Sequence, residues 1–299
     1  MTKKLFILFL IFGQFALAQS GGSTGLSFLK IGPSARSISL TDIGAIDNNI
    51  SSVYYNPASV NLLESSSVIF THQMWVQDVT SEILGANFNF WGLPFFIGVN
   101  TTKIEGFEAR TLPTDTPDAT FNVNYFYGNL STGFSLYENL EFGVTIKYLY
   151  ESLLSDDASG TGYDLGLIYT DLIENLSIGA SVRNLGSMQK LRNEKTKLPS
   201  DFIFNTTYYF KFPEISLGLK PIIGMQKYFD LDDIHLHGAA EAGYKDQFFI
   251  RLGYVTGYEA KGISAGAGVY WKGFNIDYAF TPFSYGIGNA NTFSIAYAF

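Results

Sequence analysis

Apolar and polar residues alternate with a period of two over most of the chain beyond residue 66. From Leu140 to Tyr150, every second residue is apolar or aromatic, and the residues between them are Glu141, Gly143, Thr145, Lys147 and Leu149. The last residues repeat the pattern, with Phe293, Ile295, Tyr297 and Phe299 sharing one side. Successive side chains of a β-strand point to opposite faces, so the pattern predicts strands with one apolar face and one polar face. No helical period is found here.

This alternation predicts fourteen strands, and an even number of antiparallel strands returns the chain to the end at which it entered. Their expected ranges are 66–78, 79–92, 94–104, 119–136, 140–155, 160–171, 175–186, 199–210, 214–229, 234–245, 247–258, 260–271, 273–283 and 290–299. The connections alternate between tight turns and longer or more polar loops. Tight turns are expected at 92–93, 137–139, 172–174, 211–213, 246 and 272, and longer loops at 104–118, 187–198, 230–233 and 284–289.

One of these ranges, 119–136, departs from the simple alternation. Its apolar residues occupy odd-numbered positions around Phe121 but even-numbered positions around Phe134, and the change falls across Gly128 and Asn129. A glycine-bearing β-bulge near Gly128 explains the change and keeps the strand count. A hairpin at the same place also explains it and would alter the count.

Composition identifies what the two faces contact. The chain has 19 Tyr, 27 Phe, 3 Trp and 30 Gly but only 15% charged residues, which is too few for the water-exposed surface of a soluble domain of this size. An aromatic, apolar exterior is typical of a barrel that faces lipid. No run of about 18 apolar residues follows residue 18, so strands rather than helices are expected to cross the membrane.

The first residues predict export. Lys3 and Lys4 precede an apolar stretch from Leu5 to Phe15, and residues 16–18 (Ala-Leu-Ala) form a small-x-small cleavage site before Gln19. We therefore interpret 1–18 as a cleaved signal peptide. The chain has no Cys, which excludes a lipidated cysteine, a disulfide or a thiolate metal site. Its net charge of −8 argues against a nucleic-acid partner.

Residues 19–65 differ from the region that follows. They are rich in Ser, Gly and Asn and contain short helical patches such as 33–40. Because the segment is too short to form its own core, we expect it to fold as a hatch inside the barrel of residues 66–299. A disordered tail is the alternative interpretation.

Three groups of residues were weighed as sites of chemistry. Residues 262–266 fit the Gly-x-Ser-x-Gly pattern of serine hydrolases, but Ser264 is expected in the middle of a strand rather than on the strand-to-helix turn that this chemistry needs. His235 and His237 share one side of a strand near Asp233, which makes a metal site conceivable and polar lumen residues the favoured interpretation. His72 lacks a placed Ser and carboxylate partner. We therefore expect no catalytic residue, metal or cofactor, and no enzyme.

Residues 28–36 (Phe-Leu-Lys-Ile-Gly-Pro-Ser-Ala-Arg), Asp47 and residues 54–58 (Tyr-Tyr-Asn-Pro-Ala) resemble the start of the PorV/PorQ family of the type IX secretion system, a branch of the FadL-like barrels. The resemblance continues through 164–169, 183–186, 253–254, 262–268 and 277–280. It implies a fourteen-stranded FadL-like barrel in the outer membrane of a Bacteroidota-type bacterium. It also implies a hatch motif formed by Pro33, Ser34, Ala35, Arg36, Asn56, Pro57 and Ala58.

The resemblance suggests a protein-interaction component of type IX secretion, either a PorV-like cargo shuttle or a PorQ-like anchor of the attachment complex. Its partners would be other secretion-system proteins, secreted cargo proteins and outer-membrane lipid. Docking would use the loops 104–118 and 187–198, and Phe299 would be the C-terminal barrel signal. Two rival hypotheses are a FadL-like transporter of hydrophobic small molecules, with an apolar pocket beside the hatch, and a lipid-modifying barrel enzyme.

Overall fold

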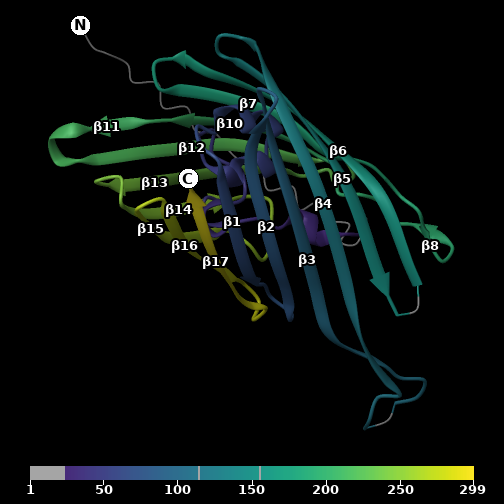
Figure 1. Cartoon of the computed structure of the whole chain (residues 1–299). Helices are drawn as coiled ribbons and strands as arrows, with labels where there is room; N and C mark the ends of the chain where they lie inside the picture. The colour runs from purple at the N-terminus through teal and green to yellow at the C-terminus, as the bar shows by residue number, and fades with distance from the viewer. Residues whose placement is uncertain (1–23, 114, 155) are drawn as a thin grey trace, which may run out of the picture.

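The computed structural model describes residues 24–113, 115–154 and 156–299, and most of them form one antiparallel β-barrel (Figure 1). Its strands are β1 (Ser67–Met74), β2 (Val79–Phe90), β3 (Leu93–Ala109), β4 (Ala119–Tyr137), β5 (Leu140–Leu153), β6 (Asp156–Ile173), β7 (Leu176–Met188), β10 (Asp201–Tyr208), β11 (Phe210–Phe212), β12 (Leu217–Tyr228), β13 (Ile234–Tyr244), β14 (Phe248–Val255), β15 (Ile263–Trp271), β16 (Phe274–Phe283) and β17 (Gly288–Ala298). A separate hairpin, β8 (Lys190–Leu191) with β9 (Glu194–Lys195), lies in the loop after β7.

The barrel is closed. The first strand, β1, pairs with the last, β17, and β10 pairs with both β7 and β12. Strands β10 and β11 are two parts of one barrel strand interrupted at Tyr209, so the described residues form fourteen barrel strands. Each expected range overlaps one of them, and the predicted fourteen-stranded all-β barrel is confirmed. The signal peptide predicted at 1–18 lies outside the described residues.

Short turns and longer loops lie at opposite ends of the barrel. The inner end, as we define it, carries the turns that follow β2, β4, β6, β11, β13 and β15 together with the C-terminus. The outer end carries the remaining connections, including the β8–β9 hairpin. Figure 1 shows the β3–β4 hairpin extending at the outer end well beyond the neighbouring strands.

Strand β4 corrects the interpretation of 119–136. It is one strand, so the hairpin alternative is wrong. The register with β3 and β5 is continuous at Gly128 and Asn129, so the bulge predicted there is wrong as well. Register shifts lie instead near the two ends of β4: against β3 between Ile104 and Phe107, where Gly106 has a φ of 81°, and against β5 between Ser135 and Tyr137. The parity changes because the aromatic residues in the outer half of β4 face the lumen.

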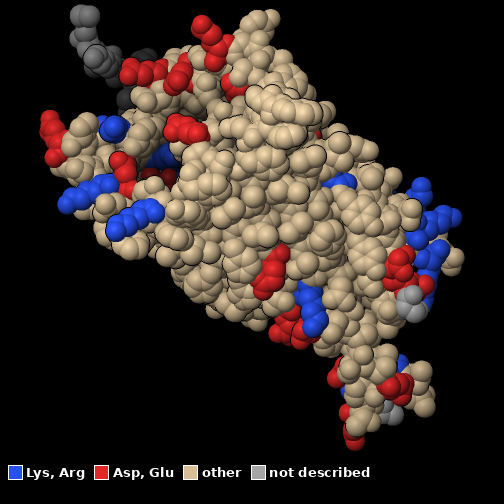
Figure 2. All heavy atoms as spheres, viewed as in Figure 1, with Lys and Arg blue, Asp and Glu red and all other residues tan. Residues whose placement is uncertain are grey.

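Apolar side chains cover the outer wall of the barrel. The outward residues of β14 and β6 include Ile250, Leu252, Leu165 and Leu167, all exposed. Charged side chains lie mainly toward the two ends in Figure 2, while Arg251 of β14 and Glu141 and Lys147 of β5 are buried in the lumen. This is the arrangement that a lipid-facing barrel requires. No helix in the described part of the chain is long and apolar enough to cross a membrane.

Residues 24–65, which we call the plug, lie inside the barrel. They form η1 (Ser27–Lys30), α1 (Ala35–Ser39), η2 (Ile50–Tyr54) and η3 (Pro57–Leu62), joined by irregular segments. Their apolar side chains pack on inward wall residues: Leu40 and Ile43 share a cluster with Ile203 and Ile222. Clusters of this kind are small hydrophobic cores, so the plug is held by burial as well as by polar contacts.

Candidate functional site

Asn56, Pro57 and Ala58 attach the plug to the wall at β6 and β7. The Asn56 side chain caps η3, since its Oδ1 accepts from the Ala58 N–H at 3.0 Å. Its Nδ2 donates to the backbone oxygens of Leu167 (2.9 Å) and Ala180 (3.1 Å). Pro57 occupies the first turn, where its missing N–H and fixed φ suit a helix start. One side chain therefore both starts a helical turn and fixes it to two strands.

Glycines in the wall make room for this attachment. A Cβ added to Gly143 would lie 2.3 Å from the Ala58 nitrogen, and one added to Gly166 would lie 2.0 Å from Asn56 Oδ1. Real Cβ atoms do not approach other atoms so closely, so a side chain at either position would push the plug away from the wall.

Pro33, Ser34, Ala35 and Arg36 form the second attachment, in which Ala35 contacts β16 and β17 and Arg36 contacts β13. Ser34 caps α1, since its Oγ accepts a hydrogen bond from the Ser37 N–H at 3.1 Å. Pro33, the residue before Ser34, is buried. The Ala35 N–H donates to Ser294 Oγ at 2.8 Å. The start of α1 is thereby fixed to the last strand.

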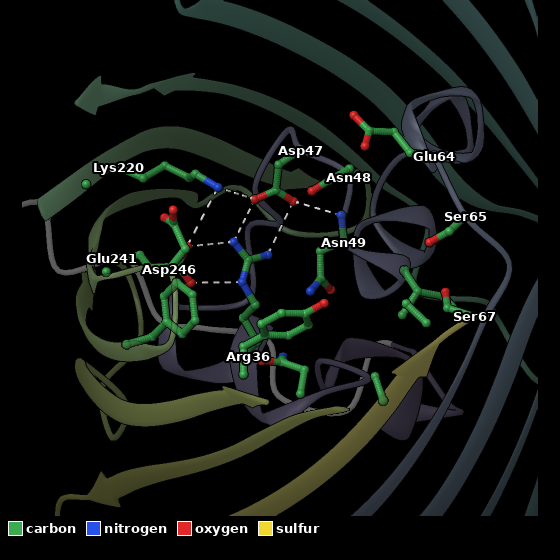
Figure 3. A pocket seen from close by; sticks show the side chains of 18 of the residues that line it. Arg36, Asp47, Asn48, Asn49, Glu64, Ser65, Ser67, Lys220, Glu241 and Asp246 are labelled. Carbon is green, nitrogen blue, oxygen red and sulfur yellow. Dashed lines mark hydrogen bonds and ion pairs between the residues drawn. The ribbon is translucent and has the colours of Figure 1, made fainter. Parts of the chain in front are cut away.

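Arg36 belongs to a buried charge cluster, which we define as Arg36, Asp47, Lys220, Glu241, Arg251 and Asp277. The guanidinium of Arg36 donates to Asp47 at 2.6 Å and to Glu241 at 2.9 Å (Figure 3). The cluster holds three cationic and three anionic side chains. Because a buried charge left unpaired is costly, the cluster favours the plug position in which these pairs form.

The wall completes the charge cluster from four strands, the fourth being β16, which carries Asp277. Lys220 of β12 contacts Asp47 at 2.7 Å, and Arg251 of β14 contacts Glu241 of β13 at 2.6 Å. Burial alone would raise the pKa of Asp47, but Arg36 and Lys220 hold it well below its usual range. Asp47 is therefore ionised at neutral pH and keeps the plug charge-paired with the wall.

Two cavities lie on opposite sides of the plug. The inner cavity, of about 480 Å³, borders the charge cluster and the inner turns, and its lining is polar and apolar in about equal parts (Figure 3). The outer pocket, of about 760 Å³, is lined by Phe28 and Ile31 of the plug and by side chains of the barrel wall near the outer end. The wall residues include Trp75, Val76, Val79, Ile104, Phe107, Tyr125 and Phe283. Among the described residues, the two cavities share no lining residue.

The outer pocket is mostly apolar, and its lining also includes two cations, Lys30 and Lys261, and two carboxylates, Glu105 and Glu259. Trp75 packs edge-on against Phe283 with ring centroids 5.4 Å apart, and Phe28 stacks on Tyr125 at 5.0 Å. Lys261 is paired with Asp42 and lies 5.7 Å from the Trp75 ring. Lys30 lies 4.8 Å from the Tyr228 ring, and burial lowers the pKa of Lys30. Such a pocket suits an apolar ligand, with polar groups at its edge.

The structure separates the residues weighed for catalysis. Ser264 faces the lumen, with its hydroxyl 3.2 Å from that of Thr281. His72 lies on the outer wall beside Glu82, 2.6 Å away. These two residues therefore lie on different faces of the barrel.

His235 and His237 both face the lumen, as their spacing predicts. The Nδ1 of His237 lies 2.8 Å from the Thr41 oxygen, and that of His235 lies 3.2 Å from the Thr256 oxygen. The described residues contain no group of three or more His, Asp or Glu side chains that could hold a metal ion.

Phe299 is exposed at the inner end, where its N–H donates to the Ser66 oxygen at 2.9 Å. Its ring stacks near that of Tyr297, with centroids 6.1 Å apart. The last residue thus continues the pairing of β17 with the start of β1.

Comparisons with known proteins identify the fold. No family model matches the chain, and no curated protein matches it significantly in sequence. Among solved structures, the toluene transporter TodX of P. putida gives a TM-score of 0.62 at 12% identity, covering 90% of this chain and 99% of that one. The Ralstonia pickettii toluene transporter TbuX gives 0.60 at 13% identity, covering 90% and 98%. The monoaromatic hydrocarbon channel CymD gives 0.61 at 12%, covering 90% and 98%. At these identities the likeness concerns the fold alone, which is FadL-like.

Proposed function

We propose that this FadL-like barrel is an outer-membrane channel for apolar small molecules and carries out no catalytic step. The observation that carries the proposal is the outer pocket, an apolar cavity that opens at the outer end and has the plug as its floor. The rival hypothesis from the sequence requires such a pocket beside the hatch. The solved channels of the same fold, named for toluene and monoaromatic hydrocarbons, support this ligand class.

The route would run from the outer pocket past the plug. An apolar molecule gains free energy on leaving water for a pocket lined by Trp75, Ile104 and Phe283. The charge cluster and the Asn56 attachment close the direct path to the inner cavity. Passage therefore requires movement of the plug or a sideways exit through the wall, and the plug would act as the hatch.

A charge placed in the outer pocket tests the proposal. Ile104 is half-buried at the pocket wall, so Ile104→Asp should fold while presenting a carboxylate to the ligand. We expect toluene uptake by cells expressing this variant to fall by about tenfold, the change produced by about 1.4 kcal/mol. Ile104→Val should leave uptake near that of the parent protein. Equal uptake by all three, at equal barrel levels, would exclude the pocket from transport.

A second candidate function is protein docking, in the manner of a PorV-like or PorQ-like component of type IX secretion. The β3–β4 hairpin favours it, because Phe107 and Phe121 stack near its tip at 5.4 Å and Phe107 is 40% exposed. Aromatic residues are enriched at protein–protein interfaces. Replacing residues 105–120 with a short turn should abolish co-purification of secretion-machinery or cargo proteins from native membranes. Their absence from the intact protein's preparation would count against this candidate.

A further inference from the structure

A groove lies on the outer wall of the barrel beneath the β8–β9 hairpin. Its volume is about 460 Å³, and it is lined by Tyr148 of β5, residues 159–161 of β6, residues 187–189 and the lysines Lys190 and Lys195. Tyr148 is 51% exposed and points away from the lumen. The groove is therefore separate from the two cavities beside the plug.

The hairpin above the groove is strongly basic. Residues 190–197 contain Lys190, Arg192, Lys195 and Lys197 but one acidic residue, Glu194. Figure 2 shows these basic side chains gathered where Figure 1 places β8. Arg192 contacts Asp156, and Lys197 contacts Asp230 at 3.8 Å. Within the described residues, Lys190 and Lys195 have no carboxylate within 4 Å.

The pairing of β8 with β9 sets these two lysines directly opposite each other. Like charges at opposite positions of a two-stranded pair are destabilising. Both lysines line the same groove, so an anion bound there would contact both and offset their repulsion. The hairpin is held over the groove, since the Gln189 N–H donates to the Ser159 oxygen at 2.7 Å.

The wall below the groove is apolar. Tyr148 pairs across the strands with Thr161, and the next outward pair toward the inner end is Ile146 with Tyr163. Ile146 is 56% exposed and Tyr163 46% exposed, and Leu165 continues the same face. A molecule with an anionic head in the groove would thus lay an apolar tail along β5 and β6. Free phosphate would contact only the lysines of the groove and not the apolar wall below them.

We propose that the groove binds a phosphate-bearing lipid of the outer leaflet, with its phosphate between Lys190 and Lys195 and its acyl chains along Ile146, Tyr163 and Leu165. Juxtamembrane lysines attract anionic lipid head groups in this way. The proposal rests on the outer-membrane placement in the proposed function but not on the ligand of the outer pocket. The bound lipid would fix the β8–β9 hairpin at the membrane surface.

The test uses the full-length barrel purified in detergent and native mass spectrometry with bisphosphorylated lipid A as the probe. The variant is Lys190→Ala with Lys195→Ala. The matched control is Lys211→Ala with Lys272→Ala, two exposed lysines at the inner end. We expect the apparent affinity for lipid A to fall by roughly thirtyfold in the variant and to stay unchanged in the control. Toluene uptake should be unchanged in both.

Two further probes separate the sources of the phosphate. Lipid A from which both phosphates have been removed should bind the parent protein about as weakly as lipid A binds the variant. Inorganic phosphate should not displace lipid A at equal concentration, because it lacks the apolar contacts. Equal lipid A binding by parent and variant, or equal binding of the dephosphorylated lipid, would overturn the proposal. Absence of toluene uptake by the parent protein, with its lipid A binding intact, would instead contradict the proposed channel.

Discussion

Arg36→Met should release the plug from the wall. The substitution leaves Asp47, Glu241 and Asp277 buried with only Lys220 and Arg251 as partners. Removing one partner of a buried ion pair costs about 3–5 kcal/mol, because the other charge remains desolvated. We therefore expect the free energy of unfolding to fall by about that amount. We also expect ion conductance in planar bilayers to rise as the plug moves.

A second variant tests the charge explanation. Arg36→Met combined with Glu241→Gln leaves two cations and two anions, with Lys220 beside Asp47 and Arg251 beside Asp277. This double variant should recover much of the stability and lower the conductance again. If Arg36→Met alone matched the parent protein in both measurements, the charge cluster would not hold the plug.

Gly143→Ala should displace the other attachment. The new Cβ would meet the Ala58 nitrogen at 2.3 Å, and backbone atoms cannot turn aside as a flexible side chain can. Overpacking of this kind costs about 1–3 kcal/mol, and here the plug must shift to relieve it. We expect a lower urea midpoint in lipid vesicles and faster proteolysis between residues 49 and 64.

Gly162→Ala is the matched control for Gly143→Ala. Gly162 also lies in the wall and is buried, but a Cβ there would meet its nearest neighbours, Leu149 and Lys147, at an ordinary 3.5 Å. Alanine also suits a strand better than glycine does, so this variant should be as stable as the parent or slightly more so. Similar losses in both variants would show that the effect comes from the strand and not from the plug.

The alternation of residues predicted the barrel because lipid and lumen each impose their own side-chain type along every strand. Residues 140–150 face the two environments as expected from the sequence. The same rule failed at 119–136, because Tyr125 and Tyr127 face inward to pack on Phe28 of the plug. Predicting an apolar patch on the lumen face requires knowing what fills the lumen. The sequence of the strand alone does not contain that information.

The sequence identified the plug residues of the site but not the wall residues. Arg36 and Asp47 were recognised from the resemblance, but their wall partners, Glu241 and Lys220 respectively, were not. One signal was available: Glu241 and Arg251 lie at equal distances from the turn at Asp246, so a hairpin places them opposite each other. The contact of Glu241 with Arg36 depends on the position of the plug, which no local pattern encodes.

The most direct test of the account is whether an apolar molecule binds in the outer pocket. Trp75 lines that pocket, while Trp91 and Trp271 are exposed at turns of the inner end. In a Trp91→Phe, Trp271→Phe variant in lipid nanodiscs, Trp75 is the remaining tryptophan of the 3 in the chain. Titration with toluene should change its fluorescence saturably, and Ile104→Asp should weaken the response. A response that only follows partitioning into lipid and is unaffected by Ile104→Asp would contradict the account.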